Sequence, residues 1–213
     1  MTDKPTHEIH YEPLTPTGFF MGRLDISKLP IDEACAWVEN NRSREGSHRI
    51  QYSPTQREDI PLGDEKGGSK SMHDAFDDII DTIDELIEEI TKKSTEAEGF
   101  WAQYQEKGQC TAYHAHGREL GNNSLKDLSF VFYLQASEEH GELVFPMQMN
   151  GMDYSKTFVP NTGGIIILPS YMPHYTHKNN ADTPRIVLSG NYREKEYMEF
   201  IRRENENRNL QQD

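Results

Sequence analysis

The segment from residue 100 to residue 192 decides the fold, and three histidines within it stand out. Two of them lie in Tyr113-His114-Ala115-His116. The third ends a strand-like run that reads Gly163-Gly164-Ile165-Ile166-Ile167-Leu168-Pro169-Ser170-Tyr171-Met172-Pro173-His174. Because side chains alternate along a strand, His114 and His116 are expected to point to the same face. His174, carried by another strand, can then complete one face of a metal's coordination sphere. Imidazole suits iron, zinc and copper alike, so the residues alone predict a metal site without naming the metal.

From Phe100 onward the apolar residues recur with period two, and turn-forming residues separate the runs. The predicted strands are Phe100–Tyr104, Thr111–His116, Leu128–Leu134, Leu143–Phe145, Lys156–Val159, Gly164–Leu168, His174–His177 and Ile186–Tyr192. Many short strands separated by turns are typical of a sandwich or a barrel.

The N-terminal half of the chain predicts an extended arm from Met1 to Gly18, a short strand from Phe19 to Leu24 and then two helices. Pro30 and the acidic residues after it begin a helix that runs to about Asn41. Apolar residues spaced by three and four from Met72 to Ile90 predict a second, longer helix. We therefore expect one α+β domain, with an N-terminal arm and supporting helices over 1–98, a barrel core over 99–192 and a charged tail over 193–213.

Composition excludes several classes of partner and indicates a compartment. The chain has 22 Lys and Arg against 36 Asp and Glu, a net charge of −14, which argues against nonspecific binding to nucleic acid or to an anionic membrane. Its two cysteines, Cys35 and Cys110, form no CxxC motif, so a reducing compartment fits better than a disulfide framework. No apolar run approaches the roughly 18 residues of a membrane span. We expect a cytoplasmic protein.

Several motifs resemble, in the right order, the core of a known enzyme family. His114-Ala115-His116 stands where that family has HxD or, in some relatives, HxH. The matching pieces that follow are Gly141-Glu142-Leu143-Val144-Phe145-Pro146 for "GGxTxFP", Val159-Pro160-Asn161-Thr162-Gly163 for "VxPxxG", and Leu168-Pro169-Ser170 through His174 for "FPxxxxH". The segment 104–191 thus resembles the iron(II)/2-oxoglutarate-dependent oxygenases, in particular the prolyl 4-hydroxylase-like branch with its short phage and bacterial relatives.

The resemblance implies a fold, an activity and a set of site residues. The fold would be a double-stranded β-helix, or jelly roll, with the N-terminal helices packed on one side. The activity would be hydroxylation of a prolyl or other residue in a peptide or protein, with release of succinate and CO2. Iron(II), 2-oxoglutarate and O2 would be needed, with ascorbate as an optional addition. By resemblance the metal ligands are His114, His116 and His174, and the cosubstrate-binding residues are Arg185, Tyr133, Tyr104 and Asn191.

Arg185 also stands out by its own chemistry. A guanidinium that opens the apolar run Ile186-Val187-Leu188 is costly to bury unless an anion accompanies it. It can make two parallel charge-assisted hydrogen bonds to a carboxylate.

The sequence departs from the family pattern at two positions. His116 replaces the usual carboxylate ligand, so the three protein ligands would be neutral. Val187 replaces the serine of an Arg-x-Ser pattern, which removes one hydroxyl from the cosubstrate site.

Other interpretations of the same residues stay open. Gly108, the HxH pair and Glu119 come close to the first cupin motif, and Gly163, Pro169 and His174 approximate the second. A three-histidine cupin-type dioxygenase, or a non-enzymatic binding barrel, would share the architecture without needing 2-oxoglutarate.

The remaining candidates have weaker support. His177 competes with His174, Glu119 or Asp127 could replace His116 as a ligand, and His140 is expected to be exposed at a turn. Substrate specificity is expected in loops at the barrel mouth, chiefly Arg118 to Asp127 and Met147 to Ser155.

Overall fold

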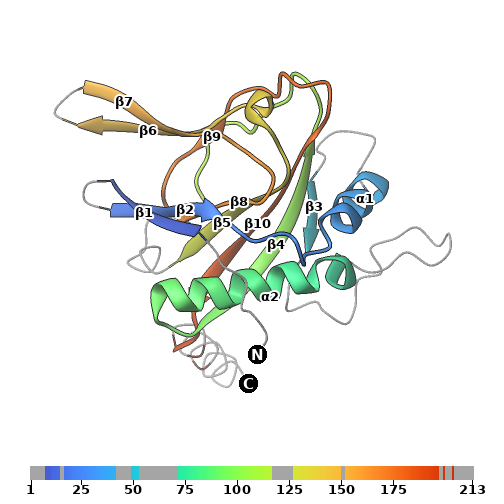
Figure 1. The fold of residues 1–213 in the computed structure, drawn as a ribbon. Coiled ribbons are helices and arrows are strands. Elements are labelled where there is room, and N and C mark those ends of the chain that lie inside the picture. The colour runs from blue at the N-terminus through green and yellow to red at the C-terminus, as the bar shows by residue number, and fades with distance from the viewer. Residues whose placement is uncertain are drawn as a thin grey trace, which may run out of the picture.

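Two β-sheets face each other and two helices cover the outer face of the larger sheet (Figure 1). This computed structural model describes residues 8–14, 17–41, 49–52, 72–116, 127–149, 152–196, 199 and 203. The strands are β1 (Glu8–Leu14), β2 (Thr17–Arg23), β3 (Arg49–Tyr52), β4 (Thr95–Gln105), β5 (Leu128–Gln135), β6 (Leu143–Met149), β7 (Met152–Phe158), β8 (Gly164–Pro169), β9 (Tyr175–Thr176) and β10 (Arg185–Glu194). The large sheet has the order β1-β2-β8-β5-β10-β4-β3, and the small one β7-β6-β9. The predicted double-stranded β-helix is confirmed.

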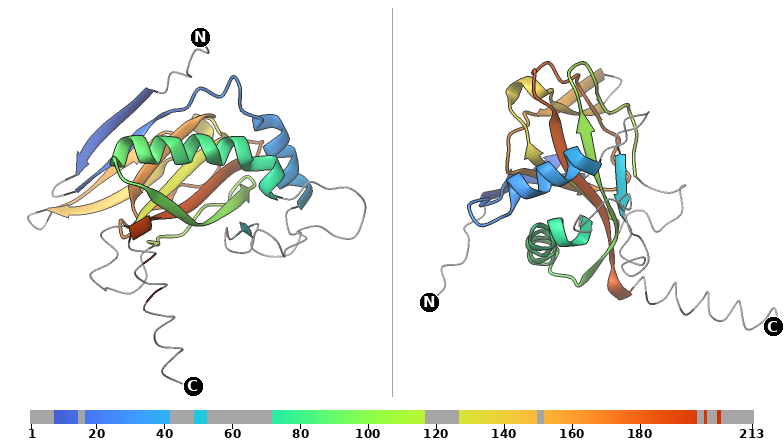
Figure 2. Two further views of the ribbon diagram at one scale, coloured as in Figure 1. Left: turned by 90° about the horizontal axis from the view of Figure 1, so that it is seen from below. Right: turned by 90° about the vertical axis from the view of Figure 1, so that its right-hand side faces the viewer.

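The helices α1 (Ile31–Asn41) and α2 (Met72–Thr91) pack on one side of the barrel, as predicted (Figure 2). Successive turns of α2 bury Phe76, Ile79 and Ile83, because apolar residues three and four apart share one helix face. The ring of Trp37 in α1 meets that of Phe76 edge-on, with centroids 5.8 Å apart. Among the helices of the described residues, neither combines the length and the apolar character that a membrane crossing requires.

Strand β10 divides the interior into two cores, because successive side chains point to opposite faces. Ile186 and Leu188 join the apolar core between the large sheet and the helices. Arg185, Val187 and Ser189 point instead into the space between the two sheets, where they line a pocket. Strand β4 alternates in the same way and contributes Trp101, Gln103 and Gln105 to that pocket. Polar groups therefore gather between the sheets, while the helix-facing core stays apolar.

The segment predicted as the strand Thr111–His116 is extended but forms no regular strand. His114 and His174 exchange two backbone hydrogen bonds, at 3.0 and 2.8 Å, as an isolated antiparallel bridge. The backbone N–H of His116 donates to the Ser170 carbonyl at 2.8 Å, and that of Thr176 donates to the Thr111 carbonyl at 3.1 Å. The ladder is too irregular to count as a strand, although it holds the segment in place.

Of the two loops predicted at the barrel mouth, the structure describes one almost completely and the other hardly at all. Met147 to Ser155 is not a loop, since most of it belongs to β6 and β7, which form an antiparallel hairpin projecting from the barrel (Figure 1). The segment from Arg118 to Asp127 lies outside the described residues except for Asp127, and so does most of the predicted tail after Glu196.

A glycine is required in the middle of β10. A Cβ atom on Gly190 would lie 2.6 Å from ring carbons of both Phe100 and Phe130, and 2.9 Å from the Gly99 carbonyl oxygen. The two rings belong to the neighbouring strands β4 and β5, which flank Gly190 in the sheet.

Gly190→Ala is therefore expected to lower the free energy of unfolding by about 1–3 kcal/mol through overpacking, measured by urea denaturation. Gly108→Ala is the matched control, because a Cβ there meets nothing within 4 Å and only its φ of +86° adds strain. That control should cost about 1 kcal/mol. Equal stability of the Gly190 variant and wild type would contradict the packing described.

Candidate metal centre

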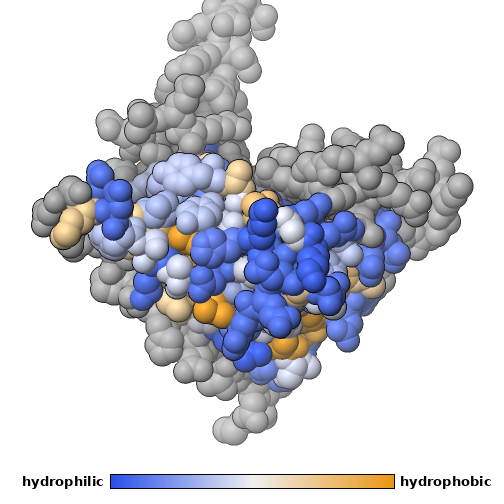
Figure 3. Space-filling model, turned by 90° about the horizontal axis from the view of Figure 1, so that it is seen from above, coloured by the Kyte–Doolittle hydropathy of each residue, from blue (hydrophilic) through white to orange (hydrophobic). Residues whose placement is uncertain are grey.

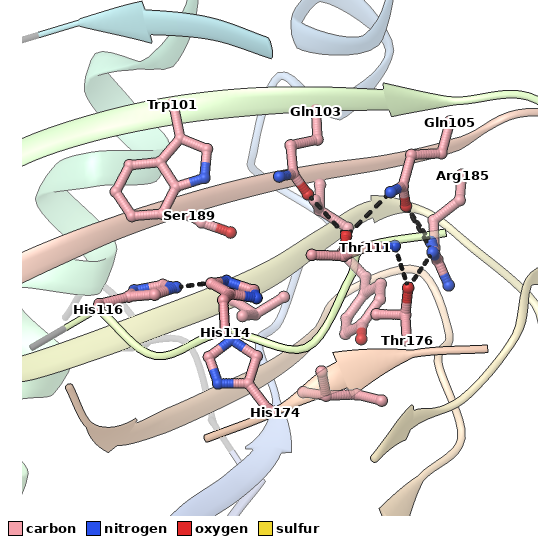
Figure 4. Close-up of a pocket in the computed structure, with 14 residues that line it drawn as sticks. Trp101, Gln103, Gln105, Thr111, His114, His116, His174, Thr176, Arg185 and Ser189 are labelled. Carbon is pink, nitrogen blue, oxygen red and sulfur yellow. Dashed lines mark hydrogen bonds between the residues drawn. The ribbon is translucent and has the colours of Figure 1, made fainter. Parts of the chain in front are cut away.

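The three histidines singled out in the sequence converge at one end of the space between the sheets (Figure 4). One ligand nitrogen from each of His114, His116 and His174 lies within 4.8 Å of the others. The Nε2 atoms of His114 and His116 are 3.0 Å apart. Two nitrogens that each lie about 2.1 Å from one ion at a right angle are separated by about the same distance.

The hydrogen bonds of the other ring nitrogens set the tautomers of His114 and His174. Nδ1 of His114 lies 2.8 Å from the Ala112 carbonyl oxygen, and Nδ1 of His174 lies 2.9 Å from that of Met172. A carbonyl oxygen can only accept, so each neutral ring carries its proton on Nδ1 and a lone pair on Nε2. Both rings are thus prepared to coordinate through Nε2.

His116 is held in the same tautomer by a buried polar cluster. Its Nδ1 lies 3.0 Å from both the Asn191 amide oxygen and the Ser129 hydroxyl. The Ser129 hydroxyl donates to the same amide oxygen at 2.8 Å and lies 2.7 Å from the Ser170 hydroxyl. With Nδ1–H donating to Asn191, the Nε2 lone pair of His116 points toward His114. Two bare lone pairs 3.0 Å apart repel each other, whereas a shared cation makes the contact favourable.

Burial keeps His174 in the form that binds metals. His174 is 3% exposed, and its removal from water, followed by the nearby His114, lowers its pKa to about 4. The ring is therefore neutral near pH 7, as a metal ligand must be. His114 and His116 are half-buried and open toward the pocket.

Arg185 lies at the other end of the same pocket, 1% exposed. Its Nη1 donates to the carbonyl oxygens of His140 at 2.6 Å and Gly141 at 2.9 Å. Its Nε and Nη2 both donate to the Gln105 amide oxygen, Nε at 2.8 Å. Nη2 also donates to the Thr176 hydroxyl at 2.7 Å. All these acceptors are neutral, and burial lowers the pKa of the guanidinium. Among the described residues, no carboxylate forms an ion pair with it.

Two hydroxyl protons at this end have no acceptor in the described part of the chain. The Tyr133 hydroxyl is fully buried and has no hydrogen-bond partner there. The Thr176 oxygen accepts from Arg185 and from the Thr111 backbone N–H at 2.8 Å, so its own proton must point elsewhere. A cation and two unused donors therefore line one end of a pocket of about 380 Å³, part of which is open to solvent. That end is suited to an anion with several acceptor oxygens.

The structure places the other predicted site residues as follows. Asn191 supports His116 and is not among the pocket-lining residues, while Tyr104 faces the helix-side core, on the opposite face of β4 from the pocket. His177 is exposed and pairs with Glu142 at 3.2 Å, apart from the three histidines. Asp127 is buried beside Arg193, with 3.2 Å between the closest atoms. Glu119 lies outside the described residues.

The prediction that His140 is exposed is wrong. His140 is 3% exposed. The Ser137 backbone N–H donates to its Nδ1 at 2.8 Å, and the Thr183 hydroxyl lies 3.1 Å from its Nε2, so both ring nitrogens have partners in the interior. Burial, and then the nearby Arg185, lower its pKa. Its backbone carbonyl is one of the acceptors that hold Arg185, so this turn forms part of the anion-binding end.

Sequence reasoning missed several residues that line the pocket. They are Trp101, Gln103, Gln105, Thr111, Thr176 and Ser189. Alternation along β4 could have found the first three, since they share one strand face. Nothing in the sequence brings Thr111 and Thr176 together with Arg185.

Comparisons with known proteins bear on the fold. No protein-family model matches the chain, and no curated protein matches it significantly. Among solved structures, the chain is similar to the epimerase SnoN from nogalamycin biosynthesis in complex with Fe3+, alpha ketoglutarate and nogalamycin RO (16% identity, 83% of this chain, 78% of that chain, TM-score 0.59). It is also similar to HygX from Streptomyces hygroscopicus with nickel and 2-oxoglutarate bound (11%, 83% and 83%, 0.58). A third is an oxidoreductase of the 2OG-Fe(II) oxygenase family from Burkholderia pseudomallei (16%, 84% and 86%, 0.50).

At these identities the likeness establishes a shared fold, which is the fold of the 2-oxoglutarate/iron(II) oxygenases. The similar structures include an epimerase and a carbocyclase, so one fold supports several reactions. Membership of the prolyl 4-hydroxylase-like branch stays a prediction.

If the three histidines bind one ion, replacing any of them with alanine should weaken Mn²⁺ or Co²⁺ binding roughly 100-fold or more, measured by calorimetry. Loss of a residue that merely supports a ligand already costs about 10- to 100-fold. His177→Ala is the control, since that ring is exposed and bonded to Glu142, and it should bind as wild type does. Similar affinity in His116→Ala and wild type would exclude His116 as a ligand.

Proposed function

We propose that the protein is an iron(II)- and 2-oxoglutarate-dependent dioxygenase. The observation that carries this proposal is a single pocket with two matched ends. Three imidazole lone pairs converge at one end, and a buried Arg185 with two unused hydroxyl donors lies at the other. A 2-oxo acid with a second carboxylate has complementary groups at its two ends. The shared fold is consistent with this proposal.

The donor set fits a divalent first-row metal. Three neutral imidazoles are suitable ligands for iron(II), and the pocket leaves room beside them for further ligands. Iron(II) with bound 2-oxoglutarate supplies the oxidative chemistry in which one oxygen atom of O2 enters the substrate and the other enters succinate, as CO2 is released.

The residues of this chain have separate roles in that reaction. His114, His116 and His174 would hold the metal, and the hydrogen bonds of Asn191 and Ser129 keep His116 oriented. The far end binds the second carboxylate through the positive charge of Arg185 and the hydroxyls of Tyr133 and Thr176. Val131, Leu143 and Val187 also line the pocket and exclude water around the cosubstrate's carbon chain.

Three neutral ligands make metal binding depend on the cosubstrate. A site with a carboxylate ligand neutralises part of the ion's charge, whereas three imidazoles leave all of it. A dianionic cosubstrate supplies the missing negative charge, so metal and 2-oxoglutarate should each bind more tightly in the presence of the other.

We propose a prolyl or other residue of a peptide or protein as the substrate. The support is the resemblance of the core motifs and the opening of the pocket to solvent. The face seen in Figure 3 is mostly hydrophilic, with apolar residues in small separate patches. Tyr113 is 65% exposed and next to His114 in the chain, so its ring is available to contact a bound substrate.

A three-histidine cupin-type dioxygenase is the second candidate, favoured by the absence of a carboxylate among the three grouped ligands. The anion-binding end argues for the first candidate. A buried cation and unused hydroxyl donors can bind the second carboxylate of 2-oxoglutarate, whereas a cupin-type reaction has no need of them.

Anaerobically purified protein supplied with iron(II), O2 and 2-oxoglutarate should release succinate, faster when a peptide library contains a substrate. Mass spectrometry should then show a gain of one oxygen atom on that peptide. O2 consumption on a substrate without 2-oxoglutarate would indicate the cupin-type reaction instead. A protein that neither binds 2-oxoglutarate nor consumes O2 would be a binding barrel.

Tyr133→Phe separates cosubstrate binding from folding. The variant removes a hydroxyl that is buried without a partner in the described part of the chain, so the ligand-free protein should be as stable as wild type or about 1 kcal/mol more stable. Binding of 2-oxoglutarate to the metal-loaded protein should weaken about tenfold, because a hydrogen bond to a carboxylate is lost.

Tyr192→Phe is the matched control on the other face of the large sheet. The Tyr192 hydroxyl donates to Asp84, so this variant should lose stability and keep wild-type affinity for 2-oxoglutarate. Unchanged 2-oxoglutarate affinity in Tyr133→Phe would show that the Tyr133 hydroxyl does not contact the carboxylate.

A further inference from the structure

The edge of Arg185 that would receive a carboxylate is already occupied. Nη1 is bound to backbone carbonyls, which fix the guanidinium in place. The Nε–Nη2 edge remains as the pair of parallel donors that matches a carboxylate. In this structure both donors of that edge point to a single oxygen, Oε1 of Gln105 (Figure 4).

The orientation of the Gln105 amide follows from its partners. A guanidinium is a donor only, so the amide must present its oxygen to Arg185. Its nitrogen then donates to the Thr111 hydroxyl at 2.9 Å, which in turn lies 3.4 Å from Oε1 of Gln103. Gln105 is thus bonded to Arg185 through its oxygen and to Thr111 through its nitrogen, and its oxygen occupies both donors of the Nε–Nη2 edge.

A neutral amide is a weaker partner for this cation than a carboxylate. Hydrogen bonds between two charged groups are shorter and roughly twice as strong as neutral ones. The Gln105 oxygen therefore satisfies the buried cation when nothing else is bound, and it can be displaced by an incoming anion. A ligand that lacks a second carboxylate has nothing with which to displace it.

We propose that Gln105 is an internal competitor for the cosubstrate: its amide oxygen occupies the Nε–Nη2 edge of Arg185 in the ligand-free protein and leaves that edge when the second carboxylate binds. This inference rests on the proposed function. It makes Gln105 a specificity-determining residue that admits 2-oxo acids with a second carboxylate and tunes their affinity.

The test measures binding to the manganese-loaded protein by calorimetry, with 2-oxoglutarate and pyruvate as probes. Pyruvate has the 2-oxo acid group but no second carboxylate. In Gln105→Ala, 2-oxoglutarate should bind about tenfold more tightly than in wild type, while pyruvate affinity stays within twofold. Gln105→Met, which keeps the side-chain length and loses the acceptor, should show the same gain if the alanine variant folds poorly.

Gln105→Glu reverses the effect. An internal carboxylate of the same shape would pair permanently with Arg185, so 2-oxoglutarate affinity should fall at least tenfold with manganese affinity unchanged. Gln148→Ala is the control, because that glutamine is exposed in β6, donates to Asp153 and does not line the pocket. Its 2-oxoglutarate affinity should change less than threefold.

The results separate this inference from the proposed function. Tighter binding in Gln105→Ala or Gln105→Met together with weaker binding in Gln105→Glu supports it. Unchanged or weaker 2-oxoglutarate binding in both neutral variants overturns it and makes Gln105 a support for Arg185. Wild-type protein that binds no 2-oxoglutarate overturns the proposed function as well.

Discussion

A guanidinium buried between two sheets, with no acidic partner among the described residues, is the constraint on which the site depends. Taking a cation out of water costs several kcal/mol unless other groups replace the lost solvation. Here neutral acceptors do so: the carbonyls of His140 and Gly141, the Gln105 amide and the Thr176 hydroxyl. These acceptors come from three separate segments, so the folded barrel creates the environment of Arg185. The charge itself stays uncompensated, which prepares the pocket for an anion.

The metal-binding end is organised by the same rule that buried polar groups need partners. Each of the three histidines uses Nδ1 in a hydrogen bond, which leaves Nε2 free to point at the others. Bonding of this kind fixes ring orientation before any ion arrives, which lowers the cost of binding it. The two ends share one pocket because β4 and β10 each place alternate side chains between the sheets. The backbone hydrogen bonds between His114 and His174, and between Thr176 and Thr111, hold the metal end beside the anion-binding end.

Much of the fold could be predicted from the sequence, because it depends on local periodicity. The period of two after Phe100 located β4 to β10, and the spacing of three and four after Met72 located α2. The three histidines were found together because their motif spacing is distinctive. Long-range contacts were not predictable: His140 looked like an exposed turn residue, yet Ser137 and Thr183 enclose it. Gln105 and Thr176 were missed for the same reason, since only the folded barrel brings them to Arg185.

The most direct test of the central claim is a crystal structure of the protein grown anaerobically with iron(II), or with manganese(II), and 2-oxoglutarate. The account predicts one ion about 2 Å from Nε2 of His114, His116 and His174. It also predicts the second carboxylate within hydrogen-bonding distance of Arg185 and the Tyr133 hydroxyl, with the Gln105 amide displaced from the guanidinium. An ion bound elsewhere, or a cosubstrate whose second carboxylate lies away from Arg185, would contradict it.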